Sequence, residues 1–223
     1  MGPSSYKMMD YLNLILVYHP KTNFMHTFQK IYFKKSVLLC CSLLMLIGAF
    51  SQVKYSAKKS LSLTVSGTST LHDWDMKSNI GTCEANFTLN ASKIITAVSG
   101  LSFTTKSENL KSGHDAMDKN AYSALKSDKS PVISYTSNSA TITKLDATDY
   151  AIKTTGKLTI AGATLDEEII ATCKVNADKS ITVMGSKKIS MKDFGMVPPT
   201  FMMGTVQTGN DVTLKFDMKL SRL

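Results

Sequence analysis

The chain has 223 residues, 43% of them hydrophobic, which is enough for one domain with its own core. Its formal net charge of +9 comes from scattered lysines, and Arg222 is the single arginine. Nucleic-acid grooves use clustered charge and arginine, so we interpret the basicity as a solvated surface and expect no nucleic-acid partner.

The first 51 residues have the features of an N-terminal extension followed by a signal peptide. Lys34 and Lys35 precede an apolar run of about 14 residues, 37–50, which is typical of a secretory signal. The run falls short of the roughly 20 residues that span a bilayer. The small side chains of Ala49 and Ser51 predict cleavage after Ser51. We therefore expect a periplasmic or extracellular protein without stable membrane insertion; the alternative is a retained anchor.

Residues 52–223 are expected to form a single all-β domain. Apolar residues alternate with polar ones on many short segments, which indicates antiparallel strands with one buried face. Turn-rich segments at regular spacing separate these strands and favour a sandwich or a barrel. The clearest inward stripes are Leu61, Leu63 and Val65; Cys83, Ala85, Phe87 and Leu89; Tyr150, Ile152, Leu158 and Ile160; Ile169, Ala171, Cys173 and Val175; and Val212, Leu214, Phe216, Met218 and Leu220.

The octet 67–74 holds the only tryptophan of the chain, Trp74, beside His72. On a strand, these two side chains would face one way and the aspartates that flank Trp74 would face the other, so neighbours in sequence do not make a site. The chain also lacks a Gly-x-Ser-x-Gly nucleophile motif. We therefore expect no catalytic residues. The alternative is a hydrolase or metal-dependent enzyme that uses His72 and His114.

The cysteines that follow the predicted cleavage site are Cys83 and Cys173. Both lie on inward faces of predicted strands. In an oxidising compartment they would form a disulfide or remain as two buried thiols. Two cysteines and two histidines without the short ligand spacings of zinc sites argue against a metal, and we expect neither a metal nor a cofactor.

One segment departs from the alternating pattern and predicts a short amphipathic helix over 114–126. Ser112 and Asp115 resemble a capping box at its start. Inserted between strands, this helix is placed to cover the open end of a barrel. The apolar residues of the segment recur at helical spacing: Met117, Ala121, Ala124 and Leu125.

Four stretches together resemble the YceI-like family, in the form associated with Bacteroidetes-type members. They are the octet 67–74, the segment 110–133, the segment 156–164 with the pattern Gly-x-Leu-Thr-Ile-x-Gly-x-Thr, and Asp-Phe-Gly at 193–195. Members are secreted barrels associated with polyisoprenoid and other lipid binding. Over nearly all of 60–220, the resemblance implies an antiparallel lipocalin-like β-barrel of about eight strands with one short inserted α-helix.

Such a barrel encloses enough space for one small ligand. The clean inward stripes are apolar and contain no carboxylate, which favours an alkyl or isoprenoid tail. The hypothesis is a carrier of one long apolar ligand (an isoprenoid, a quinone-like or a fatty-acyl lipid) under the helix 114–126 and the loop 194–204. The alternative is a structural or interaction barrel filled by its own side chains. The expected ligand-binding residues are His72, Trp74, Phe103, Met117, Tyr122, Leu125, Phe194, Phe201, Met202, Leu214 and Phe216.

Overall fold

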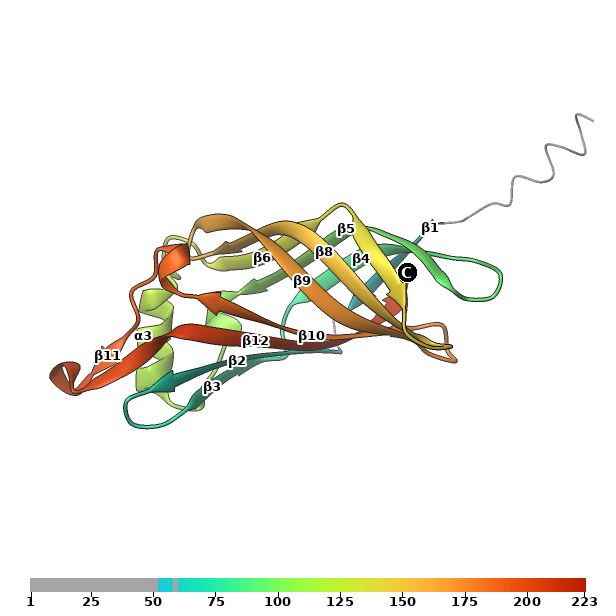
Figure 1. Ribbon diagram of the computed structural model, residues 1–223. Coiled ribbons are helices and arrows are strands. Elements are labelled where there is room, and N and C mark those ends of the chain that lie inside the picture. The colour runs from blue at the N-terminus through green and yellow to red at the C-terminus, as the bar shows by residue number, and fades with distance from the viewer. Residues whose placement is uncertain (1–51, 58–59) are drawn as a thin grey trace, which may run out of the picture. The chain divides into compact units, whose positions relative to one another are not determined.

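The computed structural model describes residues 52–57 and 60–223 (Figure 1). The extension and the predicted signal peptide lie outside the described residues, so cleavage after Ser51 and the localisation stay predictions. Along the described parts of the chain, none of the helices has the length and apolar character needed to cross a membrane.

The described residues are dominated by strands, with one α-helix, α3 (Asp115–Ala124). Three 3-10 turns accompany it in these ranges: η1 (Ser107–Asn109), η2 (Lys192–Phe194) and η3 (Met202–Gly204). The strands are β1 (Gln52–Ala57), β2 (Leu61–Ser69), β3 (Trp74–Ser78), β4 (Thr82–Leu89), β5 (Ile95–Lys106), β6 (Val132–Ser137), β7 (Ala140–Lys144), β8 (Asp149–Ile160), β9 (Ala163–Val175), β10 (Ile181–Ser190), β11 (Thr200–Phe201) and β12 (Val206–Arg222).

Eight strands form a closed ring in the order β1-β4-β5-β6-β8-β9-β10-β12, and β12 returns to pair with β1. Every pairing in the ring is antiparallel. The long strand β12 pairs with β1 near its C-terminal end and with β2 between Thr208 and Met218. The prediction of an antiparallel barrel of about eight strands with one short inserted helix is therefore confirmed.

The alternating pattern places the predicted stripes inside the barrel. Along β8, for example, Tyr150, Ile152, Leu158 and Ile160 are all buried. The less regular pattern around β5 has a local cause, because its pairing with β4 shifts register twice and Gly100 there has a φ of +57°. Such irregularities interrupt the period of two that the sequence reading relies on.

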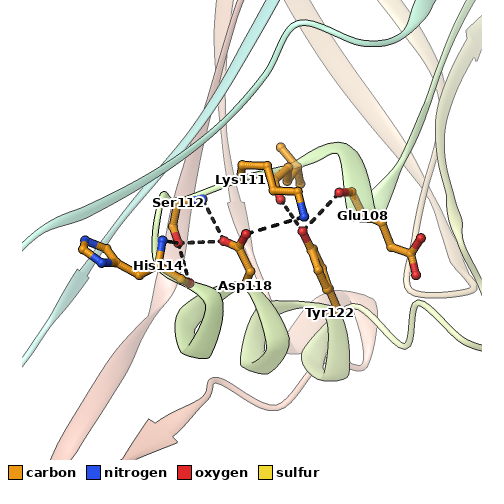
Figure 2. Close-up of polar contacts among 7 residues, drawn as sticks. Glu108, Lys111, Ser112, His114, Asp118 and Tyr122 are labelled. Carbon is orange, nitrogen blue, oxygen red and sulfur yellow. Dashed lines mark hydrogen bonds and ion pairs between the residues drawn. The ribbon is translucent and has the colours of Figure 1, made fainter.

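Helix α3 lies within the predicted range 114–126, but its start differs from the predicted capping box. His114 occupies the N-cap without a side-chain hydrogen bond. Ser112 instead binds Asp118, one turn further on: its amide and hydroxyl donate to Asp118 Oδ1 at 2.8 and 2.7 Å (Figure 2). Asp118 is buried and so offers a shielded acceptor, whereas Asp115 is exposed.

The pairing of β9 with β10 covers only part of both strands. Residues 181–185 pair with 171–175, and Gly185 opposite Ala171 is the last pair, whereas β9 pairs with β8 from 163 to 174. A Cβ atom on Gly185 would lie 2.5 Å from the Phe216 ring and 2.9 Å from the Ile170 carbonyl oxygen. This glycine therefore lets the aromatic ring cover the point where the backbone pairing ends.

Candidate ligand-binding cavity

The barrel encloses a cavity of about 610 Å³. Its wall comes from inward-facing side chains of the strands, from one side of α3 and from the loops that follow β2 and β10. The lining is almost entirely carbon and sulfur. Sites for small molecules commonly have volumes of roughly 300 to 1,000 Å³ and mostly apolar walls. Side chains therefore do not fill this lumen.

The two ends of the cavity differ in character. Helix α3 and strand β11 lie at one end of the barrel in Figure 1, which we call the mouth. The opposite, deep end is lined by buried residues such as Cys83, Phe87 and Leu220. At the mouth, Leu71 and Met202 line the cavity and are also 69% and 76% exposed. The apolar surface thus continues from the lumen to the outside.

Most of the residues predicted to bind a ligand lie on the cavity wall. Their placement does not test binding, which stays a prediction for each of them. The predicted residues on the wall are His72, Trp74, Phe103, Met117, Leu125, Phe201, Met202, Leu214 and Phe216.

Two predicted residues, Tyr122 and Phe194, lie off the cavity wall. The Tyr122 hydroxyl donates to the carbonyl oxygens of Leu110 and Glu108 at 2.8 and 3.1 Å, and the Lys111 ammonium lies 5.0 Å from its ring centroid (Figure 2). Phe194 is 0% exposed and packs in the core. Both aromatic side chains anchor the covering segments, and that they contact a ligand stays a prediction.

The side chains of His72 and Trp74 both reach the wall and both bind backbone. Trp74 Nε1 donates to the Thr68 carbonyl oxygen at 3.0 Å, and the indole lies against Gly67. His72 Nδ1 donates to the Asp73 carbonyl oxygen at 2.7 Å. These hydrogen bonds fix the two rings in place.

The aspartates of the same segment lie on the other side of the sheet. Asp73 and Asp75 are absent from the cavity wall and, with Trp74, Lys188 and Asp211, border a separate polar hollow. The two carboxylates therefore lie apart from the cavity that His72 lines. Cavity chemistry at this segment depends on His72 and not on the carboxylates.

The catalytic alternative required His72 and His114 to act together. Both line the cavity, but in the described part of the chain no hydrogen bond or ion pair joins the two rings. In the same residues no group of three or more His, Cys, Asp or Glu side chains is arranged to hold a metal. His72 and His114 are therefore two separate imidazoles on the cavity wall.

Cys83 on β4 and Cys173 on β9 are free, buried thiols in the structure, and both reach the cavity wall. Burial raises the pKa of each thiol to about 12. The nearby Glu84 carboxylate also raises the pKa of Cys83, and the nearby Cys83 also raises the pKa of Cys173. Of the two states predicted, the structure therefore contains the pair of thiols. Thiols with so high a pKa are poor nucleophiles at neutral pH.

The lumen also contains polar residues that the sequence reading did not identify. Lys187 of β10 lies on the wall, and its Nζ atom is 2.6 Å from Glu167 Oε2 on β9. Tyr135 and Thr154, also on the wall, are joined by a 2.9 Å hydrogen bond between their hydroxyls. Glu167 shares the inward parity of Ile169, although it is not itself on the cavity wall. Extending that stripe by one more step would have found it.

Comparison with known proteins places this geometry in a family. The model of the YceI-like domain matches residues 48–220. Among solved structures, BcnA of Burkholderia cenocepacia is 16% identical, covers 72% of this chain and 96% of its own, and superposes with a TM-score of 0.57. A polyisoprenoid-binding domain from Saccharophagus degradans, implicated in plant cell wall breakdown, is 9% identical, with 78% and 100% covered and a TM-score of 0.56.

At these identities the two structures show a shared fold. Comparison with curated proteins gives no match. The family model, however, covers well over half of the sequence, including the whole barrel from β1 to most of β12. The chain therefore belongs to the YceI-like domain family.

Proposed function

We propose that this protein binds one long apolar molecule in the lumen of its barrel and acts as a carrier or sequestering protein. The ligand class is an isoprenoid, a quinone-like or a fatty-acyl lipid, and the place of action is the periplasm or the cell exterior. The observation that carries the proposal is the apolar cavity of about 610 Å³. The polyisoprenoid-binding domain with the same fold supports the isoprenoid class.

The energetics favour binding through the tail alone. Each buried CH₂ contributes roughly 0.8 kcal/mol, so a sixteen-carbon chain contributes on the order of 12 kcal/mol before association costs of about 4–15 kcal/mol are subtracted. The wall that receives such a tail is apolar over most of its length. Affinity then comes from burial, and polar groups decide orientation and choice of head group.

We propose no catalytic step. In the described residues, no hydroxyl or thiol is hydrogen-bonded to the ring of His72 or His114. Activation of a serine or cysteine by histidine requires that contact.

Native mass spectrometry of gently purified protein, followed by organic extraction, tests the proposal. We expect an added mass on the wild type and its loss in Ala171→Phe, which places a large side chain on the wall. Thr172→Phe is the matched control, because Thr172 is the outward neighbour and is exposed. Wild-type protein that carries no added mass and takes up no fluorescent fatty acid would contradict the proposal.

A further inference from the structure

We propose that Lys187, held by Glu167, is the head-group site of the lumen. It selects a neutral head group whose oxygen accepts a hydrogen bond, a hydroxyl or a carbonyl, over a phosphate. This inference rests on the proposed function and adds the chemistry of the ligand's polar end.

The two charged side chains belong to the inward faces of neighbouring strands. On β9, the odd-numbered residues from 163 to 175 are the less exposed ones, and on β10 the odd-numbered residues from 181 to 189 are. Glu167 and Lys187 fall on these faces and keep side-chain exposures of only 21% and 23%. Lys187 forms part of the cavity wall. The Lys187 ammonium is therefore presented to a ligand, and Glu167 holds it there.

The place of the pair along the barrel suits a head group. It lies beyond the last backbone pair of β9 and β10, Gly185 with Ala171, and so joins the two strands on the mouth side of that pair. From there the cavity continues to the deep end past Cys173, among apolar side chains. A tail that fills the deep end leaves its head near Lys187, beneath the mouth.

Lys187 has hydrogen-bonding capacity left for a ligand. An ammonium carries three N–H donors, and among the described residues the contact of Lys187 Nζ is with Glu167. The neighbouring hydroxyls of Tyr135 and Thr154 are hydrogen-bonded to each other. The Tyr135 hydroxyl also lies 3.3 Å from the backbone carbonyl oxygen of Glu167, and the Thr154 hydroxyl lies 3.3 Å from the backbone carbonyl oxygen of Ile169. Lys187 is thus the donor that a ligand oxygen would meet.

The charge balance decides which head group fits. Lys187 and Glu167 neutralise each other, so the surrounding apolar lumen contains no net positive charge from this pair. A phosphate placed there would be a buried charge without a counter-charge and would approach the Glu167 carboxylate, which is unfavourable. A hydroxyl or carbonyl oxygen accepts from the ammonium without this cost.

Three isoprenoid probes test the inference: geranylgeraniol, geranylgeranyl phosphate and the hydrocarbon pristane. Binding is followed by the emission of Trp74, the chain's single tryptophan, which lies on the cavity wall. Lys187→Met should weaken geranylgeraniol binding about tenfold, the loss expected for a hydrogen bond to a charged group, and leave pristane binding unchanged. Lys188→Met is the matched control, because Lys188 is 69% exposed and pairs outside with Asp211. Thermal unfolding of each variant confirms that it is folded.

A second variant tests the same site by gain of binding. Glu167→Gln keeps the shape of the side chain and leaves the Lys187 charge without a counter-charge. It should raise the affinity for geranylgeranyl phosphate about tenfold relative to geranylgeraniol. Glu168→Gln, on the outward side and paired with Lys153, should not.

The outcomes separate this inference from the proposed function. Wild-type protein that binds the probes, with equal effects of the changes at 187 and 188 or with no gain from Glu167→Gln, overturns the head-group site and leaves lipid binding intact. A wild-type preference for the phosphate over the alcohol overturns it as well. Wild-type protein that binds none of the three probes counts against isoprenoid binding itself, and with it the head-group site.

Discussion

The indole of Trp74 occupies the space that a side chain at Gly67 would need, because a Cβ atom built on Gly67 would lie 2.3 Å from Trp74 Cζ2. The two residues are directly paired across β2 and β3. A glycine opposite the chain's only tryptophan therefore lets the ring lie flat on the sheet and reach the cavity.

Gly67→Ala should displace the Trp74 ring and destabilise the fold. Overpacking of this kind typically costs about 1–3 kcal/mol. The measurement is chemical unfolding by circular dichroism, with Trp74 emission recorded in the folded state. Ser62→Ala on the exposed side of the same strand is the control. Equal stability of the two variants would show that the indole adjusts without cost.

Met202 and Met203 are neighbours at the mouth, but only Met202 lies on the cavity wall. Met202→Ala should weaken binding of a fluorescent fatty acid by a few fold and change the unfolding free energy by less than about 0.5 kcal/mol, as is usual for exposed positions. Met203→Ala, at a fully exposed residue, should change neither quantity. A stability loss of about 2–5 kcal/mol in Met202→Ala would instead identify a packed core position.

Asp118 makes the start of α3 sensitive to acid. Burial raises the pKa of its carboxyl, but the hydrogen bonds from the Ser112 hydroxyl and amide, together with the Lys111 ammonium, outweigh this effect and lower the pKa overall. Because the folded-state pKa is lowered, the stabilisation is present above the unfolded value of about 3.9 and is lost as pH falls through the folded value.

The corresponding variant is Asp118→Asn. It should destabilise the protein by about 1–2 kcal/mol at pH 7, and the difference from wild type should shrink as the pH falls below about 4. Denaturant unfolding at pH 7, 5 and 3 measures this. Asp115→Asn, in the same turn and exposed, should have little effect. A difference that does not depend on pH would contradict the carboxylate role.

The thiols of Cys83 and Cys173 should resist modification in the folded protein. Burial and a pKa near 12 leave almost no thiolate at pH 8. In a chain with Cys40→Ser and Cys41→Ser, iodoacetamide should label neither thiol in the native state within minutes, and both once guanidinium is added. Intact mass spectrometry reads the result. An unfolded, unreduced protein that stays unlabelled would reveal a disulfide.

The sequence was sufficient for the strands and their buried faces because strand parity is a local property. Stripes such as Leu61 with Leu63, or Val212 with Met218, follow from alternation alone, and each of these residues is buried. The helix was also predictable, since Met117, Ala124 and Leu125 recur at i, i+7 and i+8, which shares one face of a helix but not one face of a strand. Closure of the ring could not be read in this way, because it depends on pairing between distant segments.

The candidate site was predictable only in part. Inward-facing apolar residues predict an apolar lumen, but the sequence does not show which of these residues lie on its wall. Phe194 and Phe201 look alike in the sequence, yet the first is enclosed by the core and the second lies on the wall. Charged residues were assumed to face solvent, which is why Glu167 and Lys187 were missed. Parity alone places Glu167 on the inward side, but its pairing with Lys187 on the neighbouring strand is shown only by the three-dimensional structure.

The ring is completed by Tyr55 with Arg222 and Ser56 with Ser221, so the first described strand meets the end of the last one. Contacts between segments so far apart in the chain form slowly, because a long loop must be ordered before they stabilise anything. A growing polypeptide cannot make them until residues 221 and 222 have been synthesised. Closure of the barrel therefore waits for the whole of β12, and the lumen stays open along the edge of β1 until that strand has been made.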